Sequence, residues 1–321
     1  MKTIPAPIRI ANFHANSLKE QFTALLELVK IRISLLVTSS MMAGYIWTAG
    51  QIRMETLLAA AAVLFLSCGS CALNQYQERK IDELMDRTKS RPLPSQRLKP
   101  AMALWMALSL IFSGSLILLC STGLVPLALG LFTVLWYNGV YTHLKQKTAF
   151  ASIPGALIGA IPPVIGWVSG GGSLVDPQIW ILSCFFFIWQ VPHFWLLLLD
   201  FAVDYEKAGL PSLTRRFSME QLKRIIFIWM GSTLVSCLSI PLFGFVSFSL
   251  TYLFLLTLTF WLLWNAISFF RSSPRDASFG FVFTKLNIYA FLVLFLLSLD
   301  KLLASAHMKL SLIKKMLAIV G

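Results

Sequence analysis

Nine runs of about twenty mostly apolar residues constrain the fold of this chain more than any other feature. A helix needs about 20 such residues to cross the roughly 30 Å hydrocarbon core of a bilayer, where the backbone must satisfy its own hydrogen bonds. The sequence therefore predicts an all-α integral membrane protein, with residues 1–321 forming a single polytopic domain. Transmembrane helices are expected at about 30–49, 55–73, 101–121, 123–142, 150–169, 178–199, 225–246, 248–270 and 280–303.

The composition agrees with a membrane protein. Hydrophobic residues make up 57% of the chain and charged residues 13%, whereas soluble domains have about a quarter charged residues. A net charge of +13 would suggest nucleic-acid binding in a soluble protein, but in a membrane protein excess Lys and Arg usually set the orientation. Cys68 and Cys71 form a CxxC without a second pair or a nearby histidine pair, so packing is expected there and not zinc binding.

The distribution of basic residues predicts the orientation. With a cytoplasmic N-terminus, 22 of the 27 Lys and Arg residues fall on the cytoplasmic side, as the positive-inside rule requires. The polar connections 74–100 and 200–224 are then both cytoplasmic, and the C-terminus lies on the opposite side. No leader-like apolar core with a cleavage site occurs in the first thirty residues, so no cleaved signal is expected.

Acidic residues recur at a fixed spacing in the first polar connection. Asn74, Glu78, Asp82 and Asp86 are four residues apart and would share one face of a helix that continued out of the membrane. They would then form a polar stripe about three turns long. The simpler alternative is a solvated helix whose acids pair with its own basic residues.

The second polar connection favours a functional role for these acids. Asp200 and Asp204 have the same spacing and again follow a helix of membrane-spanning length. Hard cations such as Mg²⁺ take carboxylate oxygens together with substrate phosphate, and nearby basic side chains suit the remaining phosphate oxygens. We therefore predict a diphosphate held by metal over a lipid-accessible cavity. The candidate metal ligands are Glu78, Asp82, Asp86, Asp200 and Asp204, and the candidate phosphate contacts are Arg87, Lys89, Arg91, Lys145 and Lys207.

Aromatic residues near the two connections suit an allylic substrate. Metal and basic residues stabilise diphosphate as a leaving group, and its departure from an allylic chain leaves a delocalised carbocation. Aromatic rings can stabilise such a cation while the apolar bundle excludes water, although any one ring is as readily a packing residue. The candidates are Tyr137, Tyr141, Phe194, Trp195 and Tyr205.

These residues resemble a known family, the UbiA-type intramembrane prenyltransferases. NQYQERKIDELMDRTKSRPL (74–93) is similar to its first acidic signature, and WQVPHFWLLLLDFAVDYEKAGLPSL (189–213) to its sixth helix and second acidic loop. YTHLKQKT (141–148) with IPGALIGAIPPVIGW (153–167) resembles its fourth-to-fifth helix segment. The likeness covers nearly the whole chain and is greatest to the branch that farnesylates haem B.

The resemblance implies nine helices around a central cavity, Mg²⁺ as cofactor, and farnesyl diphosphate and haem B as substrates, with haem O as product. It also implies a bacterial inner membrane as the location, and haem A synthase or terminal oxidase assembly as a downstream partner. The catalytic positions carried over are Asn74, Glu78, Asp82, Asp200 and Asp204. Together with the basic and aromatic candidates, the expected substrate-binding residues are Arg87, Arg91, Tyr141, Lys145, His193, Tyr205 and Lys207.

Two positions depart from the family pattern, and His193 is considered separately. Glu78 stands where Asp is usual, and Lys80 where another Asp is expected, which gives Asp86 added weight. His193 lies inside a predicted span, where an ionisable group is a functional candidate. Contact with the porphyrin or its iron and a purely structural hydrogen bond are both open for this histidine.

Alternative functions are compatible with the same residues. A prenyltransferase acting on a quinone precursor or chlorophyllide would use the same acidic loops, but the QVPHFW segment favours haem. A secondary transporter is the alternative from a different class, because helices broken by Pro and Gly, such as GAIPPVIGW, also mark transport sites. Against transport, the paired carboxylates are predicted at the helix mouths and not at the membrane midplane.

Overall fold

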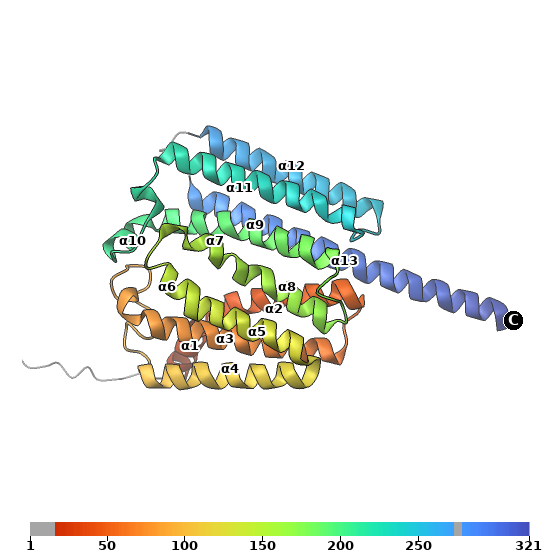
Figure 1. The fold of residues 1–321 in the computed structure, drawn as a ribbon, viewed down its shortest axis with the longest axis horizontal. Helices are drawn as coiled ribbons and strands as arrows, with labels where there is room; N and C mark the ends of the chain where they lie inside the picture. The colour runs from red at the N-terminus through yellow and green to blue at the C-terminus, as the bar shows by residue number, and fades with distance from the viewer. Residues whose placement is uncertain (1–16, 273–277, 321) are drawn as a thin grey trace, which may run out of the picture.

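The computed structural model describes residues 17–272 and 278–320, and every regular element in these ranges is a helix (Figure 1). Lys2, Arg9 and Arg275, which contributed to the predicted orientation, lie outside the described residues, as does most of the segment weighed for a signal. The helices are α1 (Leu18–Leu28), α2 (Ile31–Ala49), α3 (Met54–Asp82), α4 (Pro100–Thr122), α5 (Leu124–Leu135), η1 (Trp136–Tyr141), α6 (Thr142–Leu144), η2 (Ala149–Ala151), α7 (Ser152–Gly155), α8 (Leu157–Ser169), α9 (Pro177–Asp200), α10 (Ala202–Lys207), η3 (Leu213–Arg215), α11 (Met219–Ser239), η4 (Ile240–Phe243), α12 (Ser249–Arg271) and α13 (Phe279–Val320).

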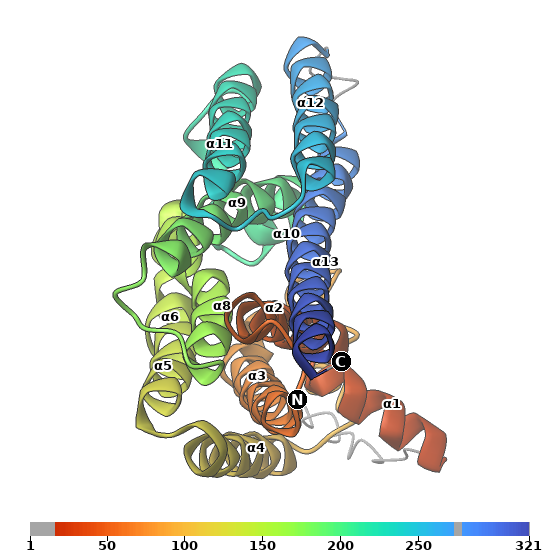
Figure 2. The same cartoon turned by 90° about the vertical axis from the view of Figure 1, so that its right-hand side faces the viewer.

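A helix forms at each of the nine predicted spans, which confirms the all-α membrane architecture. By length and composition, eight helical segments of the described residues can cross a membrane. The segment predicted at 30–49 is the ninth helix, α2, and it is not among the eight. It carries Arg32 and several hydroxyl side chains, and it packs against α3, α8 and α13 at the centre of the bundle (Figure 2).

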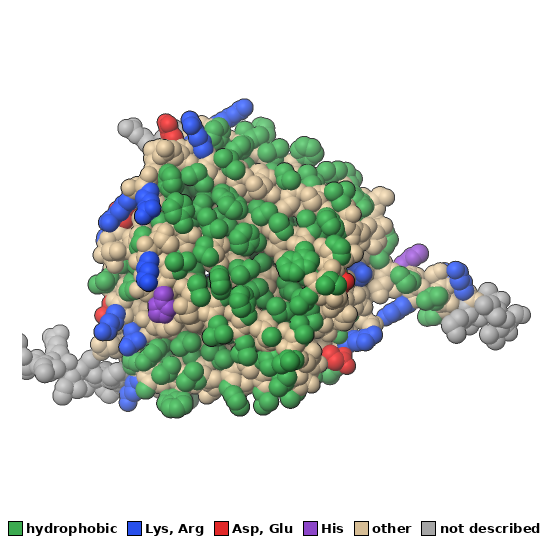
Figure 3. Space-filling view, viewed as in Figure 1, with side chains coloured by type: hydrophobic (Ala, Val, Ile, Leu, Met, Phe, Trp, Pro, Cys, Tyr) green, Lys and Arg blue, Asp and Glu red, His purple; other side chains and the backbone are tan. Residues whose placement is uncertain are grey.

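The two polar connections lie at one end of the bundle, and the C-terminus lies at the other (Figure 1). Figure 3 shows hydrophobic side chains over the middle of one face, with Lys and Arg toward its ends. This arrangement agrees with a membrane-embedded band between two polar ends. Which end is cytoplasmic stays a prediction from the basic residues.

The last helix is longer than predicted. α13 was expected over 280–303 but spans 42 residues, about 63 Å at 1.5 Å per residue, so it projects beyond the bundle (Figure 1). Asp300, a buried carboxylate on α13, accepts hydrogen bonds from the backbone N–H groups of Ser247 and Phe248 and from the Thr251 hydroxyl. It thereby satisfies donors at the start of α12 that the helix itself leaves unpaired.

Close backbone contact joins α2 to α8. A Cβ atom built on Gly166 would lie 1.8 Å from the carbonyl oxygen of Met41, and one on Gly44 would lie 2.0 Å from that of Pro163. Only glycine fits at these two crossings, because such distances are far inside van der Waals contact. Small residues of this kind allow helix backbones to approach closely in membranes.

Enlarging Gly166 is therefore expected to separate α2 from α8. We expect Gly166→Val to lower the free energy of unfolding by at least about 1–3 kcal/mol, the usual cost of overpacking, as measured by thermal or denaturant unfolding in detergent. Gly231→Ala is the control, because nothing lies within 4 Å of a Cβ at this position on α11. Equal stability of the two variants would contradict the account of this contact.

Candidate active site

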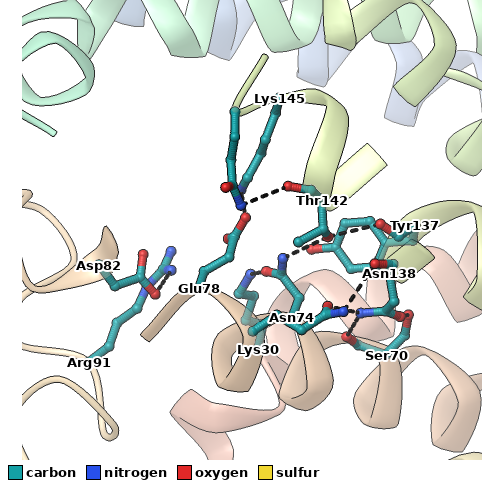
Figure 4. Close-up of polar contacts among 12 residues, drawn as sticks. Lys30, Ser70, Asn74, Glu78, Asp82, Arg91, Tyr137, Asn138, Thr142 and Lys145 are labelled. Carbon is teal, nitrogen blue, oxygen red and sulfur yellow. Dashed lines mark hydrogen bonds and ion pairs between the residues drawn. The ribbon is translucent and has the colours of Figure 1, made fainter. Parts of the chain in front are cut away.

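The last turns of α3 carry three buried polar side chains on one face. Asn74, Glu78 and Asp82 are exposed by only 1%, 3% and 1%, so the spacing of four residues does form a continuous stripe up to the end of the helix. The stripe faces the connection between α5 and α8, and Figure 4 shows these three residues with their partners. Unpaired charges this deeply buried would be costly. Each of the two carboxylates has a cationic partner, and the Asn74 amide is hydrogen-bonded.

Each member of the stripe contacts a basic side chain from another element. Lys145 Nζ lies 2.5 Å from Glu78 Oε1, and Arg91 Nη1 lies 2.8 Å from Asp82 Oδ2 (Figure 4). Lys30 Nζ donates to Asn74 Oδ1 at 3.0 Å. Burial by itself would lower the pKa of Lys145, but the Glu78 carboxylate together with Tyr141 and Tyr205 raises that pKa above its usual value. Lys145 therefore remains protonated at neutral pH.

Lys30 was not singled out from the sequence. It lies between α1 and α2 with φ of 47°, a left-handed conformation that is uncommon for residues other than glycine and that clusters at functional sites. Within residues 17–272 and 278–320, no carboxylate lies within ion-pair distance of Lys30. A lysine at the start of an apolar run is ordinarily interpreted as a topology signal, so only its backbone conformation and its contact with Asn74 reveal it.

A π-helix places further polar groups against α3. The turn η1 (Trp136–Tyr141) has the wider π geometry, which is rare and often found at functional sites. In it, Asn138 donates to the carbonyl of Ser70 and accepts from the Ser70 hydroxyl. Asn74 Nδ2 donates to Thr142 Oγ1 at 3.1 Å. The sequence signal for this turn was weak, because hydrophobic periodicity does not distinguish a π turn from an α turn.

The predicted continuation of the acidic stripe to Asp86 is wrong. α3 ends at Asp82, and the Thr88 hydroxyl donates to the Asp82 carbonyl at 2.9 Å, which satisfies one of the carbonyls left free at a helix end. The chain then turns, and Asp86 lies exposed in the connection. Its carboxylate accepts from Lys89 Nζ at 2.7 Å and from Lys207 Nζ at 2.6 Å.

The second acidic pair is tied to the first connection. Asp204 Oδ2 accepts a hydrogen bond from the backbone N–H of Arg87 at 2.9 Å, and the Arg87 guanidinium lies 4.7 Å from the centroid of the Phe201 ring. Asp200 ends α9 and Asp204 belongs to α10, so the two carboxylates are not on one helix. Asp200 is exposed and lies beside Gly280 at the start of α13.

The predicted metal ligands do not form one cluster. Among the described residues, no three His, Cys, Asp or Glu side chains are close enough together to hold a metal ion. Glu78 and Asp82 instead face Lys145 and Arg91, while Asp204 faces the first connection. The donors still fit Mg²⁺, which usually binds to one or two carboxylates and completes its shell with water and substrate phosphate.

Aromatic rings lead from the polar stripe to α9. Tyr137 stacks on Tyr141 and Tyr141 on Phe194, with centroid distances of 5.8 and 5.9 Å and an angle of 18° between the planes in both cases. Lys145 Nζ lies 5.9 Å from the Tyr141 centroid. Trp195 lies elsewhere, in the apolar core against Trp229 and Phe150, and Tyr205 on α10 makes no ring contact within the described chain.

His193 continues this aromatic path toward α13. Its ring lies 5.5 Å from Phe194, 5.0 Å from Trp189 and 4.8 Å from Phe283, measured between centroids. Its Nδ1 lies 2.7 Å from Asn287 Oδ1. The histidine is half-buried and adjoins the end of the stack that begins beside Lys145.

The sequence matches the UbiA prenyltransferase family over residues 36–298. The chain belongs to this family. Protoheme IX farnesyltransferase from Geobacter sulfurreducens is 40% identical over 222 residues, which cover 69% of this chain and 82% of that protein.

Two solved structures have the same fold. A digeranylgeranylglyceryl phosphate synthase superposes with a TM-score of 0.72 at 16% identity, covering 88% of this chain and 99% of that one. A UbiA homologue from Archaeoglobus fulgidus, bound to GPP and Mg²⁺, gives 0.65 at 14% identity, covering 87% and 99%. At such identities the likeness concerns the fold, which is the UbiA-type fold predicted from the sequence.

Lys207 is expected to hold the two connections together through Asp86. Lys207 and Lys89 lower the pKa of Asp86 to about 2 from its ordinary 3.8. Because the carboxyl pKa is lowered, the stabilisation from the Asp86–Lys207 ion pair is fully present above about pH 4 and is lost as the pH falls through about 2. Lys207→Met is expected to accelerate amide hydrogen exchange in residues 83–91 several-fold near neutral pH, measured by mass spectrometry.

Lys80→Met is the matched control for this experiment. Lys80 is exposed and has no ion-pair partner in the part of the chain that the structure describes. Exchange should stay at the wild-type rate in this variant. Identical rates in the Lys207 and Lys80 variants would show that the Asp86 contact does not restrain the connection.

Proposed function

We propose that this protein transfers the farnesyl group of farnesyl diphosphate to a vinyl group of haem B, giving haem O. The observation that carries the proposal is the buried stripe Asn74, Glu78 and Asp82, in which each residue faces a cation at the start of an aromatic stack. Membership of the prenyltransferase family supports the reaction type. The name of the Geobacter relative supports haem as the acceptor.

The paired charges suit the binding of a metal diphosphate. In the geometry described, Lys145 and Arg91 neutralise Glu78 and Asp82. When a diphosphate arrives, the two cations can turn to its oxygens, because ammonium and guanidinium groups bind phosphate as readily as carboxylate. Mg²⁺ held by Glu78 and Asp82, with Asp200 and Asp204 approaching from the other connection, would neutralise charge on the leaving group.

The chain's own residues then serve the departure of diphosphate. The bond between C1 of the farnesyl group and the diphosphate oxygen breaks, and its electron pair leaves with the oxygen. Lys145, Arg91 and Lys30 are placed to stabilise that charge, and Asn74 orients Lys30. The rings of Tyr137, Tyr141 and Phe194 are proposed to stabilise the allylic cation on the apolar side.

The acceptor vinyl group supplies the electrons for the new bond. One vinyl carbon bonds to C1 of the farnesyl cation, water adds to the other vinyl carbon, and a proton is released. His193 lies next to Phe194 at the end of the aromatic stack, which supports a position for the porphyrin near α9 and α13. Tyr205, on α10, is proposed to border the same space.

For Asp86, Arg87 and Lys207, the contacts support a role in holding the two loops together. Asp86 and Lys207 neutralise each other, and the Arg87 backbone binds Asp204. These contacts support a role in keeping the two acidic connections together over the diphosphate more than direct binding by Asp86 or Lys207. Glu78, one methylene longer than the usual Asp, reaches Lys145 from within the continuous helix α3.

The location and partners follow from the same proposal. We propose a bacterial inner membrane with the acidic connections cytoplasmic and the C-terminus on the other side, which agrees with their placement at opposite ends of the bundle (Figure 1). A haem A synthase or a terminal oxidase in assembly would receive the product. The acids lie in the last turns of α3 and around the end of α9, which disfavours transport through a site at the membrane midplane.

Removal of a single buried carboxylate is expected to abolish turnover. Asp82→Ala and Glu78→Ala should each lower haem O formation at least about 10²-fold, the scale for loss of one group that stabilises transition-state charge. The assay is chromatography of pigments from membranes supplied with haem B, farnesyl diphosphate and Mg²⁺. Asp176→Asn is the control, since Asp176 binds the Trp167 indole near the start of α9.

The outcomes of this assay separate the candidate functions. Full turnover by both carboxylate variants would contradict the mechanism. If the wild type made no haem O but prenylated a quinone precursor or chlorophyllide in competition, the acceptor assignment would be wrong. Uptake of a solute without Mg²⁺ and without any prenylated product would favour a transporter.

A further inference from the structure

His193 and Asn287 form a polar pair between two membrane-spanning helices. His193 lies on α9 and Asn287 on α13, 94 positions later, and the distance from Nδ1 to Oδ1 is 2.7 Å. The neighbouring Trp189 indole donates to the Leu286 carbonyl at 3.2 Å, so two contacts fix α9 to α13 at this level. The surrounding side chains are aromatic, namely Trp189, Phe194 and Phe283.

The pair determines which histidine nitrogen is free. Asn287 Oδ1 is a carbonyl oxygen and can only accept, so Nδ1 of His193 must carry the hydrogen and donate it. In a neutral imidazole, Nε2 then keeps its lone pair. Nε2 makes no hydrogen bond with any described residue, and it is not fully enclosed.

We propose that Asn287 is a positioning residue, which holds His193 in the Nδ1–H tautomer so that Nε2 ligates the iron of haem B. The inference rests on the proposed function and specifies how that acceptor is held. Imidazole nitrogen is the commonest metal ligand in proteins, and its second nitrogen usually donates to a carbonyl or carboxylate that sets tautomer and ring orientation. The Asn287 carbonyl meets that requirement.

The position of this pair also suits the transfer. Phe194 lies 5.9 Å from Tyr141 and 5.5 Å from His193, so one ring contacts both the stack proposed for the farnesyl cation and the histidine proposed for the iron. A porphyrin anchored through Nε2 would therefore lie beside the proposed path of the farnesyl group. Ligation also restricts how the porphyrin ring can turn, which limits the vinyl groups that can reach C1.

A purely structural hydrogen bond is the competing explanation. Such bonds between membrane helices contribute only modestly to stability, and loss of one would change stability without altering a bound haem. The decisive readout must therefore come from the iron. The Fe–His stretching band in the resonance Raman spectrum of ferrous haem reports both ligation through Nε2 and the strength of the hydrogen bond that Nδ1 of the same imidazole donates.

The experiment titrates haem B into the purified full-length protein and records affinity and the ferrous spectrum. The wild type is expected to show an Fe–His band, and His193→Ala to lose it. Asn287→Leu should lower haem affinity about 10- to 100-fold, the usual effect of removing the partner of a ligand, and should shift the band to lower frequency. Asn287→Asp keeps an acceptor at this position and should keep the band, shifted to higher frequency.

Asn265→Leu is the matched control. Asn265 lies on α12 and its side chain donates to the Trp261 carbonyl of the same helix, so its loss removes a comparable amide without touching α9. Affinity and band should match the wild type. If Asn287→Leu does not fold, Asn287→Asp still tests the positioning role. An Fe–His band at the wild-type frequency in this variant would overturn that role.

Each remaining outcome is decisive. A haem that binds to the wild type without a histidine band, while haem O is still formed, overturns this inference and leaves the proposed function standing. A band that is present and identical in the wild type and in both Asn287 variants overturns the positioning role. Absence of haem O formation by the wild type overturns the proposed function, whatever the spectra show.

Discussion

The buried carboxylates of Glu78 and Asp82 each need a cation from another part of the chain, and the remainder of the site is arranged around these two pairs. Lys145 comes from the connection after α6, and Arg91 from the turn that follows α3. Breaking a buried pair by removing one partner typically costs 3–5 kcal/mol. The pairs therefore hold the first polar connection and the end of the π-helical segment against α3.

This arrangement explains how acids can gather in a membrane protein before a substrate binds. Charges buried this deeply must be neutralised, and the groups that neutralise them are the ones that we propose to bind the diphosphate. Exchange of carboxylate for phosphate at Lys145 and Arg91 costs little, because both anions offer oxygens of similar geometry. The second connection contributes at a distance, with Asp204 bound to the Arg87 backbone and Asp86 bound to Lys207.

Much of the fold followed from hydrophobicity, whereas the site needed tertiary contacts. Runs of twenty apolar residues located nine helices, and the spacing of Asn74, Glu78 and Asp82 predicted their shared face. The end of α3 was misplaced, because the spacing continues to Asp86 while the backbone turns after Asp82. Lys30, the π-helix at Trp136–Tyr141 and Asn287 were missed, since a backbone conformation or a partner 94 residues away leaves no local sequence pattern.

We infer that Lys145 and Arg91 exchange carboxylate for phosphate when substrate binds, and a structure with bound substrate would show whether they do. The measurement is an experimental structure of the protein with Mg²⁺ and a thiodiphosphate analogue of farnesyl diphosphate, whose sulfur bridge resists cleavage. We expect Lys145 and Arg91 to contact diphosphate oxygens and Glu78 and Asp82 to face the metal. The prenyl chain should run along Tyr137, Tyr141 and Phe194. A diphosphate bound elsewhere, with the Glu78–Lys145 and Asp82–Arg91 pairs intact, would contradict this inference.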